Sequence, residues 1–189
     1  MKKILFVNAC VREDSRTLLL ARHYLSHLDG EIEEVDLAKE DVRPLNRETL
    51  KAREKDVACG NVKPYSRAIS FSEADEIVVA APYWDYSYPA SIKCYIEDIN
   101  CYGICYRYEN DQPFGLCRAE RLAYITTAGG WIGDFDFGYA HFKALCETFY
   151  GIKNTVEFKV DHLDIQGSDP RKLIEEGKKE IDSYFEKIK

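Results

Sequence analysis

Residues 4–17 read ILFVNACVREDSRT, and this stretch decides the fold class. The apolar run at residues 4–7 is typical of a buried strand, and the polar residues after it lead to an amphipathic helix capped by Ser15. A helix that begins at the edge of a sheet presents free backbone N–H groups and the positive end of its dipole. The stretch therefore predicts a strand, a loop and a helix that together offer a site for an anion such as phosphate.

The loop in this stretch excludes two common phosphate-binding motifs. Residues 8–17 contain no glycine, whereas the P-loop and the dinucleotide-binding turn both need glycines for close approach to phosphate. The loop instead offers the hydroxyls of Ser15 and Thr17 and the guanidinium groups of Arg12 and Arg16. A capping serine beside surface arginines explains the same residues about as well, so the loop alone leaves both interpretations open.

Short apolar runs and helical stretches alternate along the rest of the chain, which predicts a parallel sheet with helices on both faces. The length of 189 residues, without repeats or linkers, fits one domain covering residues 1–189. The predicted strands are Lys3–Val7, Ile32–Leu37, Glu76–Ala81, Arg121–Thr126 and Thr155–Val160.

Apolar residues at helical spacing predict the helices. The first is expected to bury Leu18, Ala21, Leu25 and Leu28 against the sheet. The others are predicted at Glu48–Ser72, in pieces interrupted near Gly60 and Pro64, then at Pro89–Ile99, at Phe137–Phe149, and from Pro170 to Ile188 after a cap at Ser168 or Asp169. Residues Tyr102–Leu116 are predicted as a polar loop of the kind that often overhangs a site.

Composition excludes several classes of protein. The 26 basic and 33 acidic residues give a net charge of −7, which argues against binding to nucleic acid or to an anionic membrane. The apolar run near the N-terminus is too short for a signal peptide, and no apolar run of membrane-spanning length follows, so we expect a cytoplasmic protein. The cysteines, seven in number and without a C-x-x-C pair, are expected to be reduced thiols.

Two further loops follow predicted strands at the same edge of the sheet, where open α/β sheets bind ligands. Residues 82–89 read PYWDYSYP, and four exposed aromatics there need a cover, whether a flat ligand, a partner subunit or the chain itself. Residues 126–131 read TTAGGW, in which paired glycines allow close approach of the backbone to a ring. Gly-Gly is by itself only a turn signal.

Taken together, these segments resemble a known family. The run APYWDYSYPASIK at residues 81–93, with Ser15-Arg16-Thr17 before it and Thr127-Ala128-Gly129-Gly130 after it, looks like the flavodoxin-like FMN-dependent NAD(P)H oxidoreductases, the azoreductase and quinone reductase family. FYGI at residues 149–152 and LDIQG at residues 163–167 extend the resemblance over nearly the whole chain. It implies a flavodoxin-like five-stranded parallel sheet of order 2-1-3-4-5 and an FMN-containing homodimer with a shared active site.

The resemblance also implies roles for individual residues. Ser15, Arg16 and Thr17 would hold the FMN phosphate. Pro82, Tyr83, Trp84, Asp85 and Tyr86 would line the isoalloxazine ring, and Thr127, Ala128, Gly129 and Gly130 would meet its pyrimidine side. Two positions depart from the family's pattern: Cys10 stands in the phosphate loop where a serine is common, and Asp85 stands where azoreductases commonly have asparagine. His141 lies close to where quinone reductases place a histidine near the hydride path, although packing on a helix surface also explains it.

The implied function is two-electron, ping-pong hydride transfer from NADH or NADPH through FMN to small aromatic acceptors, namely quinones, azo compounds or nitroaromatics. A flavin-binding electron carrier or redox sensor without efficient turnover is the alternative, and a regulatory protein with weakened flavin binding is a third. No metal site is expected. His23 and His27 lie opposite the predicted apolar face of their helix and are expected to be solvated. Cys94, Cys101, Cys105 and Cys117 lack the compact spacing of a cluster motif.

Overall fold

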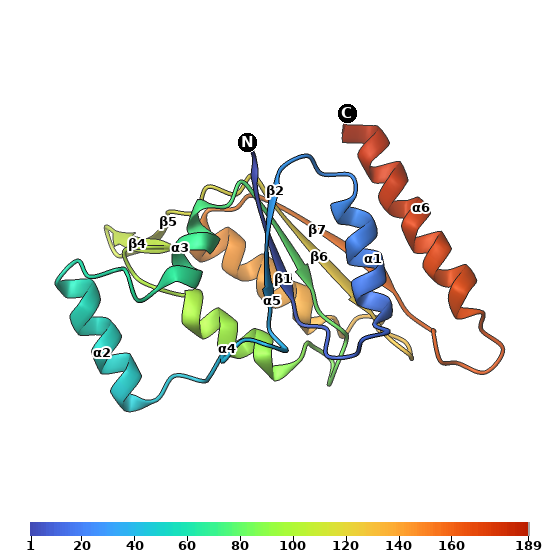
Figure 1. The fold of residues 1–189 in the computed structure, drawn as a ribbon, viewed down its shortest axis with the longest axis horizontal. Helices are drawn as coiled ribbons and strands as arrows, with labels where there is room; N and C mark the ends of the chain where they lie inside the picture. Colours follow the sequence, from blue (N-terminus) through green and yellow to red (C-terminus); the bar gives the residue numbers. More distant parts are fainter. Residues whose placement is uncertain (189) are drawn as a thin grey trace.

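A computed structural model describes residues 1–188 of the chain, and its centre is a parallel sheet (Figure 1). The strands lie in the order β2-β1-β3-β6-β7, which confirms the predicted order 2-1-3-4-5. Each predicted strand is confirmed to within one residue at either end. The observed bounds are Lys3–Asn8 (β1), Glu31–Asp36 (β2), Glu76–Ala80 (β3), Arg121–Thr127 (β6) and Asn154–Val160 (β7).

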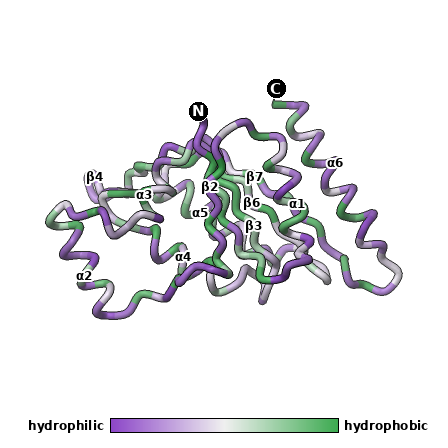
Figure 2. The backbone as a smooth tube through the Cα atoms, in the orientation of Figure 1, coloured by the Kyte–Doolittle hydropathy of each residue, from purple (hydrophilic) through white to green (hydrophobic). Residues whose placement is uncertain are grey.

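Helices cover both faces of the sheet. Side chains alternate between the faces along each strand, so Ile4 and Phe6 of β1 contact one helical layer while Leu5 and Val7 contact the other. One layer is formed by α1 (Arg16–Leu25) and α6 (Pro170–Ile188), and the other by α3 (Ser66–Glu73), α4 (Ala90–Ile99) and α5 (Phe137–Leu145), with a π-helical turn η1 (Cys146–Tyr150) continuing α5. Figure 2 shows the hydrophobic colours concentrated along the central strands.

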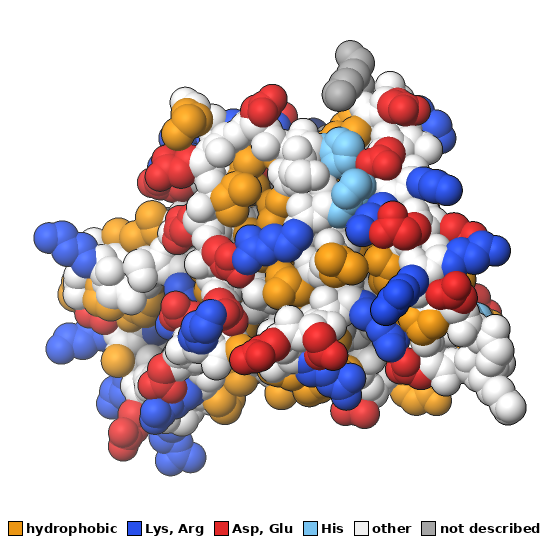
Figure 3. Space-filling view, turned by 45° about the vertical axis from the view of Figure 1, so that its right-hand side comes forward, with side chains coloured by type: hydrophobic (Ala, Val, Ile, Leu, Met, Phe, Trp, Pro, Cys, Tyr) orange, Lys and Arg blue, Asp and Glu red, His pale blue; other side chains and the backbone are white. Residues whose placement is uncertain are grey.

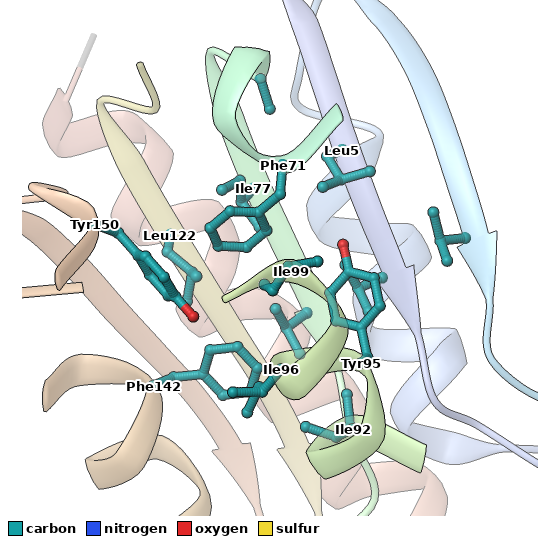
Figure 4. Packing of buried hydrophobic residues seen from close by; sticks show 14 of the residues in the cluster. Leu5, Phe71, Ile77, Ile92, Tyr95, Ile96, Ile99, Leu122, Phe142 and Tyr150 are labelled. Carbon is teal, nitrogen blue, oxygen red and sulfur yellow. The ribbon is translucent and has the colours of Figure 1, made fainter. Parts of the chain in front are cut away.

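The second layer is built largely on aromatic side chains. Phe71 of α3, Tyr95 of α4 and Phe142 of α5 are fully buried and gather over the sheet together with Tyr150 of η1 (Figure 4). Such large side chains dominate the energetics of a core. By contrast α2 (Arg47–Ala58) buries none of its residues. It ends before Gly60 and α3 begins at Ser66, so the predicted interruption between two helical pieces is confirmed. None of the helices within residues 1–188 has the length and apolarity needed to span a membrane.

The buried face of α1 is wider than the predicted one. Ala21 and Leu25 are buried as predicted, and Leu18 and Leu28 are partly buried against the same core, but Leu20 and Tyr24 are buried as well. The difference arises because α6 packs along the flank of α1, so residues beside the sheet-facing stripe are also covered. His23 and His27 therefore face α6, and the prediction that they are solvated is wrong.

Residues 102–116 also differ from the prediction. They contain an antiparallel hairpin of β4 (Tyr106–Glu109) and β5 (Gln112–Gly115) instead of a polar loop. Its turn residues, Asn110 and Asp111, both adopt positive φ, at 51° and 60°, as a two-residue hairpin turn requires. The hairpin packs beside η1 and leads into the start of β6, so it lies at the amino-terminal edge of the sheet and does not overhang the cavity described below (Figure 1).

Gly177 lets α6 approach the sheet closely. A Cβ atom at this position would lie 2.5 Å from Cγ2 of Val160 in β7. We expect Gly177→Ala to lower the free energy of unfolding by about 1–3 kcal/mol because the added carbon overpacks this contact. This loss of stability is opposite in sign to the gain of about 1 kcal/mol that alanine gives over glycine at an exposed position inside a helix.

Denaturant unfolding measures this change, with Ser183→Ala on the exposed side of the same helix as the matched control. If Gly177→Ala instead stabilises the chain, the close contact between α6 and β7 does not exist in solution.

Candidate functional site

Three loops meet around one cavity at the carboxyl-terminal edge of the sheet. They follow β1, β3 and β6, and the cavity between them has a volume of about 200 Å³. Most of the residues predicted for the cofactor therefore come together. Those that line the cavity are Ser15, Arg16, Thr17, Pro82, Tyr83, Trp84, Thr127, Ala128 and Gly129.

The first loop presents the start of α1 to this cavity. Ser15 is the N-cap, as predicted, and its hydroxyl accepts a hydrogen bond from the Leu18 amide at 3.2 Å. The amides of Arg16 and Thr17 lie in the first helical turn and have no hydrogen-bond partner within residues 1–188. Two free N–H donors and the positive end of the helix dipole thus line one wall of the cavity.

A buried hydrogen bond joins the first and third loops. The hydroxyls of Thr17 and Thr127 lie 2.7 Å apart, and both side chains are buried. This contact fixes the start of α1 against the end of β6, so the free amides and the glycine-rich segment hold a constant separation.

A fourth loop, which the sequence-based prediction missed, closes the cavity. Asp164, after β7, accepts a hydrogen bond from Nη1 of Arg16 at 2.7 Å, and Leu163 also lines the wall. A Cβ atom on Gly129 would lie 2.4 Å from Oδ2 of Asp164, so this approach requires glycine there. Val11, Arg12 and Asp14 of the first loop complete the lining. The position of Leu163 and Asp164 just beyond a strand's carboxyl end was the signal that could have identified them.

The aromatic loop folds as a tight turn at the cavity rim. Trp84 and Ser87 exchange two backbone hydrogen bonds, of 3.2 and 2.7 Å, across Asp85 and Tyr86. Those two central residues have φ of 51° and 63°, a left-handed conformation that costs side-chain-bearing residues on the order of 1 kcal/mol or more each. Neither Asp85 nor Tyr86 lines the cavity.

Three other predicted residues also lie outside this cavity. Cys10 is buried beneath it, where burial raises the pKa of the thiol to about 11 and keeps it protonated. Gly130 is not part of the lining. His141 lies on α5, where Nδ1 contacts the hydroxyl of Tyr88, and burial together with the charge of Lys93 lowers its pKa.

A group of exposed aromatic side chains borders the site. Tyr86 packs against Phe135 at a ring distance of 5.5 Å, and the Tyr83 hydroxyl donates to the Phe135 carbonyl at 3.0 Å. The group, called the aromatic rim below, consists of Trp84, Tyr86, Trp131, Phe135 and Phe137, each at least 42% exposed. So much exposed aromatic surface in one place is typical of a ligand or protein contact.

Two half-buried carboxylates lie behind the aromatic rim. Asp136 caps α5 through the Tyr139 amide, and Glu157 of β7 shares the ammonium of Lys159, which lies 3.6 Å from Asp136 and 3.5 Å from Glu157. Burial, followed by the hydrogen bond and negative charge of Asp136, raises the pKa of Glu157 to about 8. The pair therefore holds a proton near neutral pH.

This pair predicts a dependence of stability on pH. Between the ordinary Glu157 pKa of 4.5 and its folded value of about 8, the folded chain retains a proton that the unfolded chain has released. The contribution of this proton to the stability of the fold is complete below the lower pKa and is lost as pH rises through the upper one. We expect Glu157→Gln to raise the melting temperature in alkaline buffer and to change it little in mildly acidic buffer.

Melting curves across this pH range measure the effect, with Glu147→Gln, an exposed glutamate on η1, as the control. A native chain whose melting temperature follows the same pH dependence as Glu157→Gln would contradict the shared proton.

Known proteins resemble this chain along nearly its whole length. The sequence profile of a family described as flavodoxin-like fold matches residues 2–185. An FMN-dependent NADH:quinone oxidoreductase of Lachnoclostridium phytofermentans is 30% identical over 189 residues, which cover 94% of this chain and 95% of that protein.

Solved structures show the same fold. An azoreductase from Bacillus anthracis superposes with a TM-score of 0.84 at 22% identity and covers 99% of this chain and 100% of its own. An FMN-dependent NADH-azoreductase from the same species, solved in complex with FMN, superposes with a TM-score of 0.82 at 19% identity and covers 100% of this chain and 99% of its own.

Proposed function

We propose that this chain, which belongs to the flavodoxin-like family of FMN-dependent NAD(P)H oxidoreductases, uses FMN to reduce small aromatic acceptors with NADH or NADPH. The acceptors are quinones, azo compounds or nitroaromatics. One observation carries the proposal: the free amides of α1, the aromatic loop and the glycine-containing segment after β6 meet at a single cavity.

The residues of the cavity suit FMN. The amides of Arg16 and Thr17, the Thr17 hydroxyl and the guanidinium of Arg12 form a donor-rich wall for a phosphate. The volume of about 200 Å³ is smaller than the roughly 300–1,000 Å³ typical of a whole ligand site. We therefore assign the phosphate end of FMN to this cavity and its flat ring to the loop at residues 82–86 and the segment at residues 127–130.

When bound, FMN supplies hydride transfer between the nicotinamide donor and the acceptor, and the protein supplies orientation and electrostatics. The chain's own residues fix the cofactor from two sides. The hydrogen bond between Thr17 and Thr127 holds the phosphate wall in register with the segment that meets the ring. Pro82 and the tight turn at Asp85 and Tyr86 keep the aromatic loop in one conformation. No protein side chain is required to donate or accept a proton for this chemistry.

We also propose that residues 1–189 act as one domain and that two copies form a homodimer with a shared active site. The aromatic rim supports the homodimer because its exposed rings would be covered by a second chain. The free cysteines and the use of NAD(P)H favour the cytoplasm as its location. Light scattering coupled to size-exclusion chromatography measures the assembly.

The first experiment is the visible absorption spectrum of the purified protein, followed by heat release and chromatographic identification of any flavin. Oxidation of NADH and NADPH is then followed with menadione as acceptor. Stoichiometric FMN with turnover supports the proposal, whereas FMN without turnover favours the electron carrier or redox sensor. A colourless protein that does not take up added FMN would overturn the flavin assignment.

A further inference from the structure

Two histidines at the carboxyl-terminal end of α1 and one carboxylate of α6 meet at the surface, away from the candidate site. His23 lies in the last turn of α1, and His27 lies two residues beyond its end. Nε2 of His23 lies 2.7 Å from Oδ1 of Asp182, and Nε2 of His27 lies 2.8 Å from the same oxygen. Ser15 begins α1 at the cavity, so the histidines are roughly 12 Å or more further along the helix axis. Figure 3 shows histidine side chains at the surface beside an acidic group.

The surroundings hold the two imidazole rings in place. The His27 ring stacks on the Phe185 ring of α6, with a centroid distance of 4.6 Å and an interplanar angle of 7°. The His23 ring contacts the His27 ring edge-on at a centroid distance of 5.2 Å. The histidine side chains are only 26% and 24% exposed, whereas Asp182 is 44% exposed. The rings are thus oriented before any ligand arrives, and the carboxylate side remains open to water.

Hydrogen bonding identifies Asp182 as a charged acceptor. Because a carboxylate can only accept, each Nε2 carries a proton and donates it to Asp182. A cation placed between these three atoms would replace the two protons, with each imidazole then carrying its proton on Nδ1.

We propose that His23, His27 and Asp182 form a binding site for a divalent transition-metal ion, with zinc as the test ion, that fastens α6 to α1. The three ligand atoms lie within 4.8 Å of one another. Tetrahedral zinc sets its ligand atoms about 3.3 Å apart, so the two measured contacts need to open by about 0.5 Å, a shift within reach of an exposed aspartate side chain.

The ligand set favours this class of ion over others. Two imidazoles and one carboxylate, with a fourth position left to water, form a common open zinc site. Calcium and magnesium prefer oxygen ligands, and copper(I) prefers sulfur, so neither class suits this cluster. The contacts join residues 155 and 159 positions apart in the chain, and a metal there would close almost the whole chain into a loop. The ion would therefore stabilise the folded chain.

Zinc binding to the purified full chain tests the proposal after treatment with a chelator and desalting. Titration calorimetry with zinc chloride should show one ion per chain with a micromolar dissociation constant. The melting temperature should rise by roughly 5–10 °C at a hundredfold excess over that constant. Cobalt(II) should give visible d–d bands without the near-ultraviolet charge-transfer band of a thiolate ligand, which separates this site from the free cysteines.

Three variants and one control identify the ligands. His23→Gln, His27→Gln and Asp182→Asn keep polar groups at the contact, and each should weaken zinc binding at least about tenfold. Glu180→Gln removes the same charge from an exposed position on α6 and should leave binding unchanged. No binding by the native chain at millimolar zinc would overturn the proposal. Binding that all three variants retain, or a cobalt spectrum with thiolate ligation, would do so as well.

Discussion

Ser15→Asp is expected to lower the affinity for FMN at least about 100-fold while the helix that begins there remains intact. Aspartate caps a helix as well as serine does, and its charge interacts favourably with the helix N-terminus. The same charge would face the phosphate that we place beside the free amides of Arg16 and Thr17. Two like charges about 4 Å apart repel by about 4 kcal/mol at an effective dielectric constant near 20, and salt lowers this figure.

Two controls isolate the phosphate from the rest of the flavin. Ser15→Asn also caps the helix but adds no charge, so its FMN affinity should stay close to that of the native chain. Riboflavin lacks the phosphate, so Ser15→Asp should bind it as the native chain does. Flavin fluorescence titration of the native chain and the two variants with FMN and with riboflavin measures these affinities. If Ser15→Asp binds FMN as tightly as the native chain, the phosphate is not held at the start of α1.

The cavity could be predicted largely from local sequence because its position follows from one rule of topology. Parallel strands that alternate with helices bring their carboxyl ends to one edge of the sheet, and three of the loops there carried recognisable residues. The tight turn at Asp85 and Tyr86 was harder to predict because residues with side chains rarely adopt positive φ. The same reason explains the hairpin at residues 106–115, whose turn is Asn110-Asp111 and contains no glycine.

Contacts between residues far apart in sequence could not be predicted. The helical pattern of α1 shows which of its sides is apolar. It does not show that α6 packs against the side that carries His23 and His27. Asp164 reaches Arg16 because Gly129 has no side chain, and that depends on how two distant loops pack. Each such contact is set by the assembled layers, which single-sequence periodicity does not contain.

Arg121→Met is expected to lower the free energy of unfolding by about 3–5 kcal/mol because it leaves a buried carboxylate without its main partner. Glu76, the first residue of β3, is 1% exposed. Its Oε1 accepts hydrogen bonds from Nη2 of Arg121 at 2.8 Å, from Nε at 3.0 Å and from the Tyr24 hydroxyl at 2.9 Å. Arg121 also donates to the Tyr184 hydroxyl of α6 at 3.0 Å, so the loss extends across three elements of the fold.

A second variant separates the energetic cost of the unpaired charge from the cost of lost packing. Glu76→Gln in the Arg121→Met background keeps an acceptor for Tyr24 but carries no charge, so the double variant should be more stable than Arg121→Met alone. Urea unfolding of the two single variants and the double variant gives the coupling energy directly. Simple addition of the two single effects would show that Glu76 and Arg121 are independent. Since domains of this size are stable by only about 5–15 kcal/mol, leaving the Glu76 carboxylate buried without Arg121 would remove a large share of the stability of the fold.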